Sequence, residues 1–111
     1  MLAGGSLLLA LAAARTAAQG PREIEIEARR FRYTPNEIPL KAGDPVVLVF
    51  RAIDFMHGFH VPDLKLRADL VPGQLTRVAL PPLRAGTLDF LCDNFCGDEH
   101  EDMHGRFIVS A

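Results

Sequence analysis

Polar and apolar residues alternate along much of this chain, in short segments separated by turns. Residues 23–28 read Glu, Ile, Glu, Ile, Glu, Ala, which is the period-two pattern of a strand with one buried face. Residues 46–50 are five consecutive apolar residues, mostly β-branched, and they predict a central strand buried on both faces. Further extended segments are expected at residues 29–33, 75–80, 87–92 and 105–109.

Segments rich in Pro and Gly separate these predicted strands. Val71-Pro72-Gly73-Gln74 is typical of a turn, and Pro81-Pro82 ends the preceding strand because neither proline can donate to a ladder. Residues 52–62 show no clear period and predict an irregular loop, whereas residues 64–70 predict either a short strand or an irregular crossing. No amphipathic helix longer than a turn or two follows residue 20. Seven or so short strands with such turns predict an all-β, Greek-key β-sandwich.

The first twenty residues differ from the rest in composition. Residues 1–14 contain no charge and are rich in Leu and Ala, and small residues follow them. This apolar run has about the length of a signal-peptide core and falls short of the roughly 20 residues that span a bilayer. No basic residue precedes it, so an uncleaved membrane anchor helix with an upstream extension is the alternative. Either interpretation places domain 21–111 in the periplasm or otherwise outside the cytoplasm, secreted or anchored.

Length and charge restrict the classes of function. The chain has 111 residues, enough for one domain with a small hydrophobic core. Apolar residues make up 49% and charged residues 23%, which excludes a disordered chain or a protein with many membrane spans. The net charge of −2 argues against a nucleic-acid binder, since such domains carry surplus Lys and Arg to neutralise phosphates.

Residues 92–103 concentrate the metal-binding chemistry of the chain. Two thiols, an imidazole and a thioether occur there at short spacing, from Cys92, Cys96, His100 and Met103. Soft and borderline ligands at this density favour copper or zinc over magnesium or calcium, and the thioether favours copper. A disulfide between the two cysteines is the alternative in an exported protein. The nearby His100 and Met103 favour metal binding over a disulfide.

A second imidazole comes from His57, which lies after the most buried predicted strand. A β-sandwich can bring this segment and residues 92–103 together at one end. Cys92 ends one predicted strand and Met103 precedes the next, so both ends of the loop are held, and Gly97 permits a tight backbone. A rigid framework suits a copper ion that exchanges electrons, because its ligand geometry then changes little between oxidation states.

The spacing Cys92-x3-Cys96-x3-His100-x2-Met103, with the upstream segment that contains His57, resembles a known motif. It is similar to the binuclear copper A site of the periplasmic domain of cytochrome c oxidase subunit II and of nitrous-oxide reductase. The likeness extends over residues 28–109 and implies a cupredoxin fold. It also implies two copper ions that are bridged by the two cysteine thiolates.

The remaining ligands also follow from this resemblance. His57 and His100 would each bind one copper ion, Met103 would be a weak ligand to one ion, and the backbone carbonyl of Asn94 a weak ligand to the other. Oxidase subunits usually carry Glu at the Asn94 position, where its side chain helps hold a metal at a subunit interface. They also have a two-helix membrane hairpin and a tryptophan-rich stretch that receives electrons, and this chain contains no Trp. A free or singly anchored copper A cupredoxin is therefore expected rather than an oxidase subunit proper.

The leading hypothesis is a one-electron carrier whose partner is a c-type cytochrome or a terminal oxidase or reductase. Five acidic residues of the loop predict either a solvated surface or a docking face for a basic partner. They are Asp93, Asp98, Glu99, Glu101 and Asp102. One alternative is a mononuclear blue-type cupredoxin with a single cysteine ligand, and another is a copper-binding chaperone that delivers Cu(I) to an oxidase. Catalysis by the domain alone is not expected, because the ligand set leaves no open position for substrate.

Overall fold

The computed structural model describes residues 20–94, 97 and 100–111. These residues form nine β-strands and two short 3-10 helices. They are β1 (Arg22–Arg29), β2 (Arg32–Thr34), β3 (Glu37–Lys41), β4 (Val46–Ala52), β5 (His57–Val61), η1 (Pro62–Leu64), β6 (Leu66–Leu70), β7 (Leu75–Leu80), β8 (Gly86–Leu91), η2 (His100–Asp102) and β9 (His104–Ser110). The predicted leader, residues 1–19, lies outside the described part, and no helix within that part is long and apolar enough to cross a membrane.

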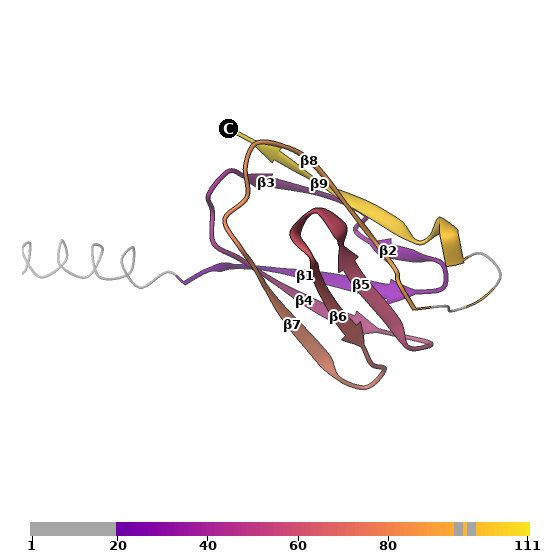
Figure 1. Ribbon diagram of the computed structural model, residues 1–111. Helices are drawn as coiled ribbons and strands as arrows, with labels where there is room; N and C mark the ends of the chain where they lie inside the picture. The colour runs from indigo at the N-terminus through magenta and orange to yellow at the C-terminus, as the bar shows by residue number, and fades with distance from the viewer. Residues whose placement is uncertain (1–19, 95–96, 98–99) are drawn as a thin grey trace, which may run out of the picture.

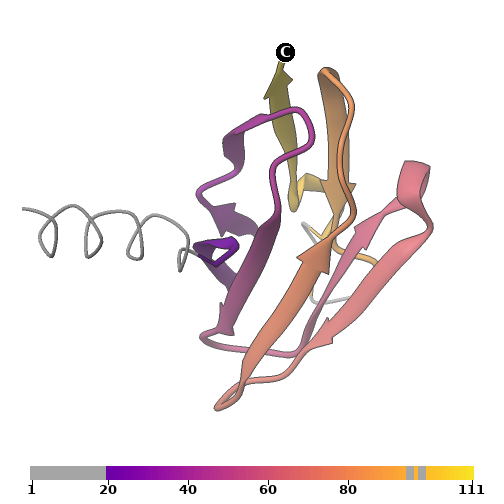
Figure 2. The same cartoon turned by 90° about the vertical axis from the view of Figure 1, so that its left-hand side faces the viewer.

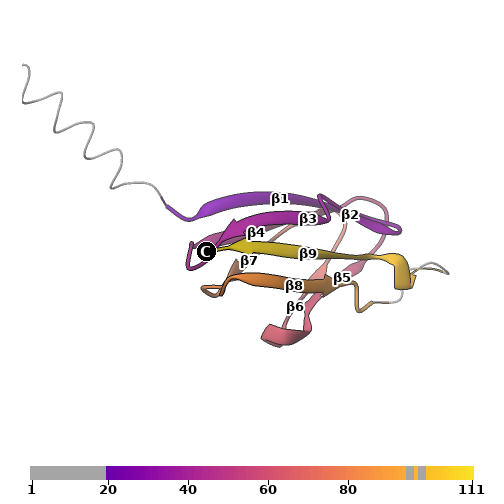
Figure 3. The same ribbon diagram turned by 90° about the horizontal axis from the view of Figure 1, so that it is seen from above.

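The strands form two sheets that pack face to face (Figure 1 and Figure 3). One sheet has the order β2-β1-β4-β7 and the other the order β3-β9-β8-β5-β6. The pairs β1–β4 and β3–β9 are parallel, and the other pairs are antiparallel. The end strands β6 and β7 lie side by side where the two sheets meet (Figure 2). The predicted all-β sandwich is thus confirmed.

Strand alternation accounts for the core. In β1 the side chains of Ile26 and Ala28 are buried and the intervening glutamates face outward, and β9 alternates in the same way. Five aromatic rings, contributed by both sheets, fill the centre, with neighbouring centroids 4.6 to 6.5 Å apart. They belong to Tyr33, Phe50, Phe59, Phe90 and Phe107, all essentially inaccessible to solvent. Since Phe59 lies in β5 and Phe90 in β8, this cluster fixes the two strands that lead to the candidate site.

The sequence patterns did not predict all of the strands. The prediction of an irregular segment over residues 52–62 was wrong for β5, which pairs with both β6 and β8. This strand is buried on nearly every residue, so it lacks the polar alternation that marks a half-exposed strand. At residues 64–70 the strand begins only at Leu66, after the η1 turn. The extended segment predicted at residues 29–33 was wrong at residues 30 and 31, which form the turn between β1 and β2. The unpredicted strands β3 and β5 account for the higher strand number.

Candidate metal centre

The ends of β8 and β9 hold the cysteine-rich loop at one end of the sandwich. Leu91 pairs with His104, and the backbone N–H of Cys92 donates to the carbonyl of Met103 at 3.0 Å. The side chains of both residues are buried, with exposed fractions of 2% for Cys92 and 1% for Met103. The chain then runs along β9 to the C-terminus at the opposite end (Figure 1). The expectation that the loop is held at both ends is therefore confirmed.

His57 begins β5 and is fully buried beneath this loop. Its ring nitrogen Nε2 lies 3.0 Å from Oδ1 of Asp54, whose other oxygen accepts the backbone N–H of Arg30 at 3.0 Å. Partial burial raises the pKa of Asp54, but these hydrogen bonds outweigh it and hold that pKa below its ordinary value. The ionised carboxylate can only accept, so Nε2 of His57 carries the proton.

In the neutral imidazole, the second ring nitrogen of His57 then carries the lone pair. This atom, Nδ1, is buried and has no hydrogen-bond partner among the described residues. Buried polar atoms are nearly always paired, and a histidine that ligates a metal typically donates its other N–H to a carboxylate. Asp54 and His57 have this arrangement. Nδ1 is thus the ring atom of His57 that could bind a metal.

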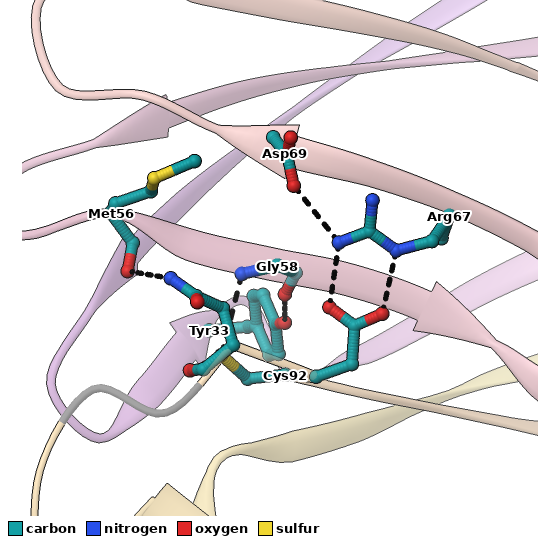
Figure 4. A network of polar contacts seen from close by, with 8 residues as sticks. Tyr33, Met56, Gly58, Arg67, Asp69 and Cys92 are labelled. Carbon is teal, nitrogen blue, oxygen red and sulfur yellow. Dashed lines mark hydrogen bonds and ion pairs between the residues drawn. The ribbon is translucent and has the colours of Figure 1, made fainter.

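Cys92 lies directly beside the backbone that follows His57 (Figure 4). Its thiol is free, and Sγ accepts the backbone N–H of Gly58 at 3.4 Å. The same sulfur lies 3.2 Å from the carbonyl oxygen of Asn94, to which the thiol donates. The carbonyl of Gly58 in turn accepts the hydroxyl of the buried Tyr33. The backbone that follows His57 and the sulfur of Cys92 are therefore brought together from two distant parts of the sequence.

Gly58 permits this close approach. A Cβ at residue 58 would overlap Oδ1 of Asp93 and would lie 3.3 Å from the backbone nitrogen of Asn94. Gly97, farther along the loop, has φ +146°, and a Cβ there would lie 2.8 Å from the ring of Phe31. The prediction that Gly97 permits a tight backbone agrees with this conformation.

Comparison with known proteins agrees with this architecture. The sequence profile of the cupredoxin-like domain family matches residues 2–109. The chain belongs to this family. The cupredoxin domain is 39% identical over 75 residues to the alternative cytochrome c oxidase subunit 2 of Bradyrhizobium diazoefficiens, covering 68% of this chain and 27% of the relative. It is 30% identical over 92 residues to cytochrome c oxidase subunit 2 of Thermus thermophilus, covering 81% of this chain and 68% of the relative.

A solved structure is also similar to this cupredoxin domain. The NMR solution structure of a copper binding protein in the apo form matches it with a TM-score of 0.68 and 32% identity, over 83% of this chain and 90% of that chain. Against the oxidase subunits, by contrast, the domain spans only 27% of the Bradyrhizobium relative and 68% of the Thermus relative.

Four of the six predicted ligand residues of the cupredoxin domain are placed by the structure. His57, Cys92, Asn94 and Met103 gather around the start of β5 and the ends of the loop. Cys96 and the side chain of His100 lie outside the described residues, so their ligation stays a prediction. Among the side chains that are described, no group of three or more His, Cys, Asp or Glu residues forms a complete site.

The Asn94 side chain has a role in the cupredoxin domain that sequence reasoning missed. Its amide nitrogen donates to the carbonyl of Met56 at 2.9 Å, which ties the loop to the segment that precedes His57. A glutamate at this position could not donate that hydrogen bond. Asp54, the partner of His57, was also missed as a supporting residue. Its position three residues before His57 was the signal available in the sequence.

Proposed function

We propose that this cupredoxin domain binds two copper ions in a copper A centre and carries single electrons between redox proteins outside the cytoplasm. The observation that carries the proposal is the buried Nδ1 of His57, which has no hydrogen-bond partner among the described residues, on a segment whose next residue, Gly58, donates its backbone N–H to Sγ of Cys92. Imidazole, thiolate and thioether form a donor set that suits copper. The relatives named cytochrome c oxidase subunit 2 support the copper A type, and the similar copper binding protein supports the choice of metal.

The proposed ligands follow from the sequence motif and the placed residues. The thiolates of Cys92 and Cys96 would bridge the two ions, and His57 and His100 would each bind one of them. Met103 and the carbonyl of Asn94 would be weak ligands. When bound, the copper pair supplies reversible one-electron oxidation and reduction. No ligand position is left open for a substrate, so the domain would be a carrier and would not itself be a catalyst.

The protein contributes a rigid and dry environment to such a centre. His57, Cys92 and Met103 are buried, which keeps water away from the ligand atoms. The Gly58 N–H that points at Sγ of Cys92 stabilises negative charge on that sulfur, and the Asp54 carboxylate orients the ring of His57. Because these contacts come from strands fixed by the aromatic core, the ligands would move little when an electron arrives or leaves.

The surface beside His57 offers a place for a redox partner. Ile53, Phe55 and Met56 are 38 to 39% exposed, and the ring centroid of Phe55 lies 6.2 Å from that of His57. The sequence also carries several acidic residues in the loop that follows Cys92, which would favour a partner with positive charge. A c-type cytochrome with a basic surface, or a terminal oxidase or reductase, is the proposed partner. Extracytoplasmic localisation and a leader or anchor at residues 1–20 belong to the same proposal.

The first prediction concerns electron exchange with such a partner. The copper-loaded chain should be reduced rapidly by a reduced c-type cytochrome in stopped-flow absorbance measurements, and the rate should fall as ionic strength rises. Phe55→Ser should slow the second-order rate by roughly three- to tenfold, because it removes an exposed aromatic contact beside the centre. Ile108→Ser is the matched control, since Ile108 is similarly exposed but lies on β9 away from His57.

A copper chaperone would behave differently in the same experiment. It would exchange electrons slowly and would release Cu(I) to a competing chelator or to a metal-free acceptor protein. Slow reduction together with transfer of copper would contradict the electron-carrier proposal. An equal loss of rate in Phe55→Ser and Ile108→Ser would contradict the placement of the docking surface.

A further inference from the structure

A second polar network lies immediately behind the Cys92 sulfur, on the face formed by β5 and β6 (Figure 4). Arg67 of β6 binds the carboxylate of Asp93 with two nitrogens, Nε to Oδ2 at 2.7 Å and Nη2 to Oδ1 at 3.0 Å. Its Nη2 also donates to Oδ1 of Asp69 at 2.9 Å, which holds the guanidinium in place from the other side. The network therefore joins an edge strand to the first residue after Cys92.

We propose that Arg67 is a positioning residue for the metal centre, which fixes the Cys92-Asp93-Asn94 segment against β5 by holding Asp93. The proposal rests on the proposed function, because it assigns Arg67 to the same copper site. Among the described residues Arg67 contacts no proposed ligand atom, so its effect would pass through the backbone of Asp93.

The surroundings of Asp93 make it suited to this task. On one side of it Cys92 presents Sγ, and on the other side Asn94 presents the carbonyl that lies 3.2 Å from that sulfur. The Asp93 carboxylate lies on the bare backbone of Gly58, where a Cβ would overlap its Oδ1. Gly58 is the residue whose N–H reaches Sγ of Cys92. A shift of Asp93 would thus change the position of Asn94, the contact with Gly58, or both.

The strand register explains why the arginine that holds Asp93 comes from β6. Asp69 pairs with Gly58 and Arg67 pairs with His60, so the two network residues of β6 lie across from the second and fourth residues of β5. A bidentate arginine–carboxylate pair fixes direction as well as distance. Exposed ion pairs of this kind contribute little to the stability of a whole domain. Loss of Arg67 should therefore loosen the loop locally and leave the sandwich folded.

The metal-free protein provides the first test. In the full chain carrying Cys96→Ser, Arg67→Met should raise the rate of iodoacetamide alkylation at Cys92 about fivefold, the factor expected from a favourable exposed ion pair. Peptide mass spectrometry identifies the modified residue. Arg77→Met is the matched control, because Arg77 is also about half exposed and pairs with Glu23 on the other sheet. That control should leave the alkylation rate unchanged.

The copper-loaded chain provides the second test, with both cysteines present. Arg67→Met should shift the visible absorption bands and the copper hyperfine splitting, Arg67→Lys should restore them in part, and Arg77→Met should not change them. Asp93→Asn should reproduce the effects of Arg67→Met, and the double variant should be no worse than either single one.

Three outcomes would overturn the positioning role. The first is that Arg67→Met has the same Cys92 alkylation rate and the same copper spectra as the control Arg77→Met. The second is a thermal unfolding midpoint lowered far more in Arg67→Met and Asp93→Asn than in the control, because the effect would then be global. The third is a double variant whose effects are the sum of the single ones. Failure of the proposed function would look different. A wild-type chain that binds only one copper ion would contradict the copper A proposal, but it would not alter the alkylation result, which is measured on metal-free protein.

Discussion

Replacement of Cys92 by serine should destroy the binuclear copper signal completely. A serine hydroxyl does not ionise at neutral pH and cannot supply the bridging thiolate, and the buried oxygen would also lose the soft character that copper prefers. The chain should then bind at most one copper ion, and the absorption and spin-resonance features of a shared centre should be absent. Cys96→Ser should have the same effect, because the two thiolates are proposed to act as equivalent bridges.

The folding of the metal-free Cys92→Ser variant is the control for this prediction. Serine is nearly isosteric, and its hydroxyl retains neighbours in the Gly58 N–H and the Asn94 carbonyl. The free energy of unfolding should fall by only about 1 kcal/mol, measured by urea denaturation. If either serine variant kept two copper ions and an unchanged spectrum, the bridging assignment would be wrong.

Gly58→Ala should weaken both the fold and the copper site. The new Cβ would overlap Oδ1 of Asp93 and lie 3.1 Å from its Cγ, while Arg67 holds that carboxylate in place. Either the Asp93 side chain must leave Arg67, or β5 or the loop must move, at a cost of about 1 to 3 kcal/mol in the free energy of unfolding. The Gly58 N–H would move away from Sγ of Cys92, so copper affinity should fall as well. Urea denaturation and competition with a copper chelator measure the two effects.

A second substitution, at Asp93, tests whether the loss of stability comes from the overlap with the Asp93 side chain. Asp93→Gly removes the side chain that Gly58→Ala would strike, so the double variant should recover most of the lost stability. It should not be less stable than Gly58→Ala alone. An unaltered stability in the single Gly58→Ala variant would show that the close packing of β5 against residues 93 and 94 is unimportant.

The sandwich was predictable from sequence where a strand had one exposed face or formed a continuous apolar run. The alternation in β1 and the apolar run of β4 gave those strands directly, and the prolines after β7 marked its end. Strand β5 was not predictable in this way, because both its faces are covered and Gly58 resembles a turn residue. The short β3 contains too few residues for a period to be visible, and the predicted segment 29–33 divides between the end of β1 and the start of β2.

For the candidate site, the ligand residues were predictable from the sequence and the contacts that support them were not. The types of ligand and their spacing can be read from a short stretch of the sequence, so the copper hypothesis did not require the structure. The supporting contacts are different, since Arg67 and Asp93 are 26 residues apart and Asn94 and Met56 are 38 apart. A single sequence holds no signal for such pairs, which depend on strand register. The orientation of the His57 ring likewise depends on the contact between Asp54, which lies between β4 and β5, and Arg30, which lies between β1 and β2.

The central proposal is the binuclear centre, and copper stoichiometry combined with electron paramagnetic resonance tests it most directly. The chain reconstituted with copper should contain two ions per polypeptide, and the oxidised state should show one unpaired electron whose hyperfine pattern is shared over both nuclei. One copper ion per chain, with a spin confined to a single nucleus, would contradict the proposal and favour a mononuclear cupredoxin.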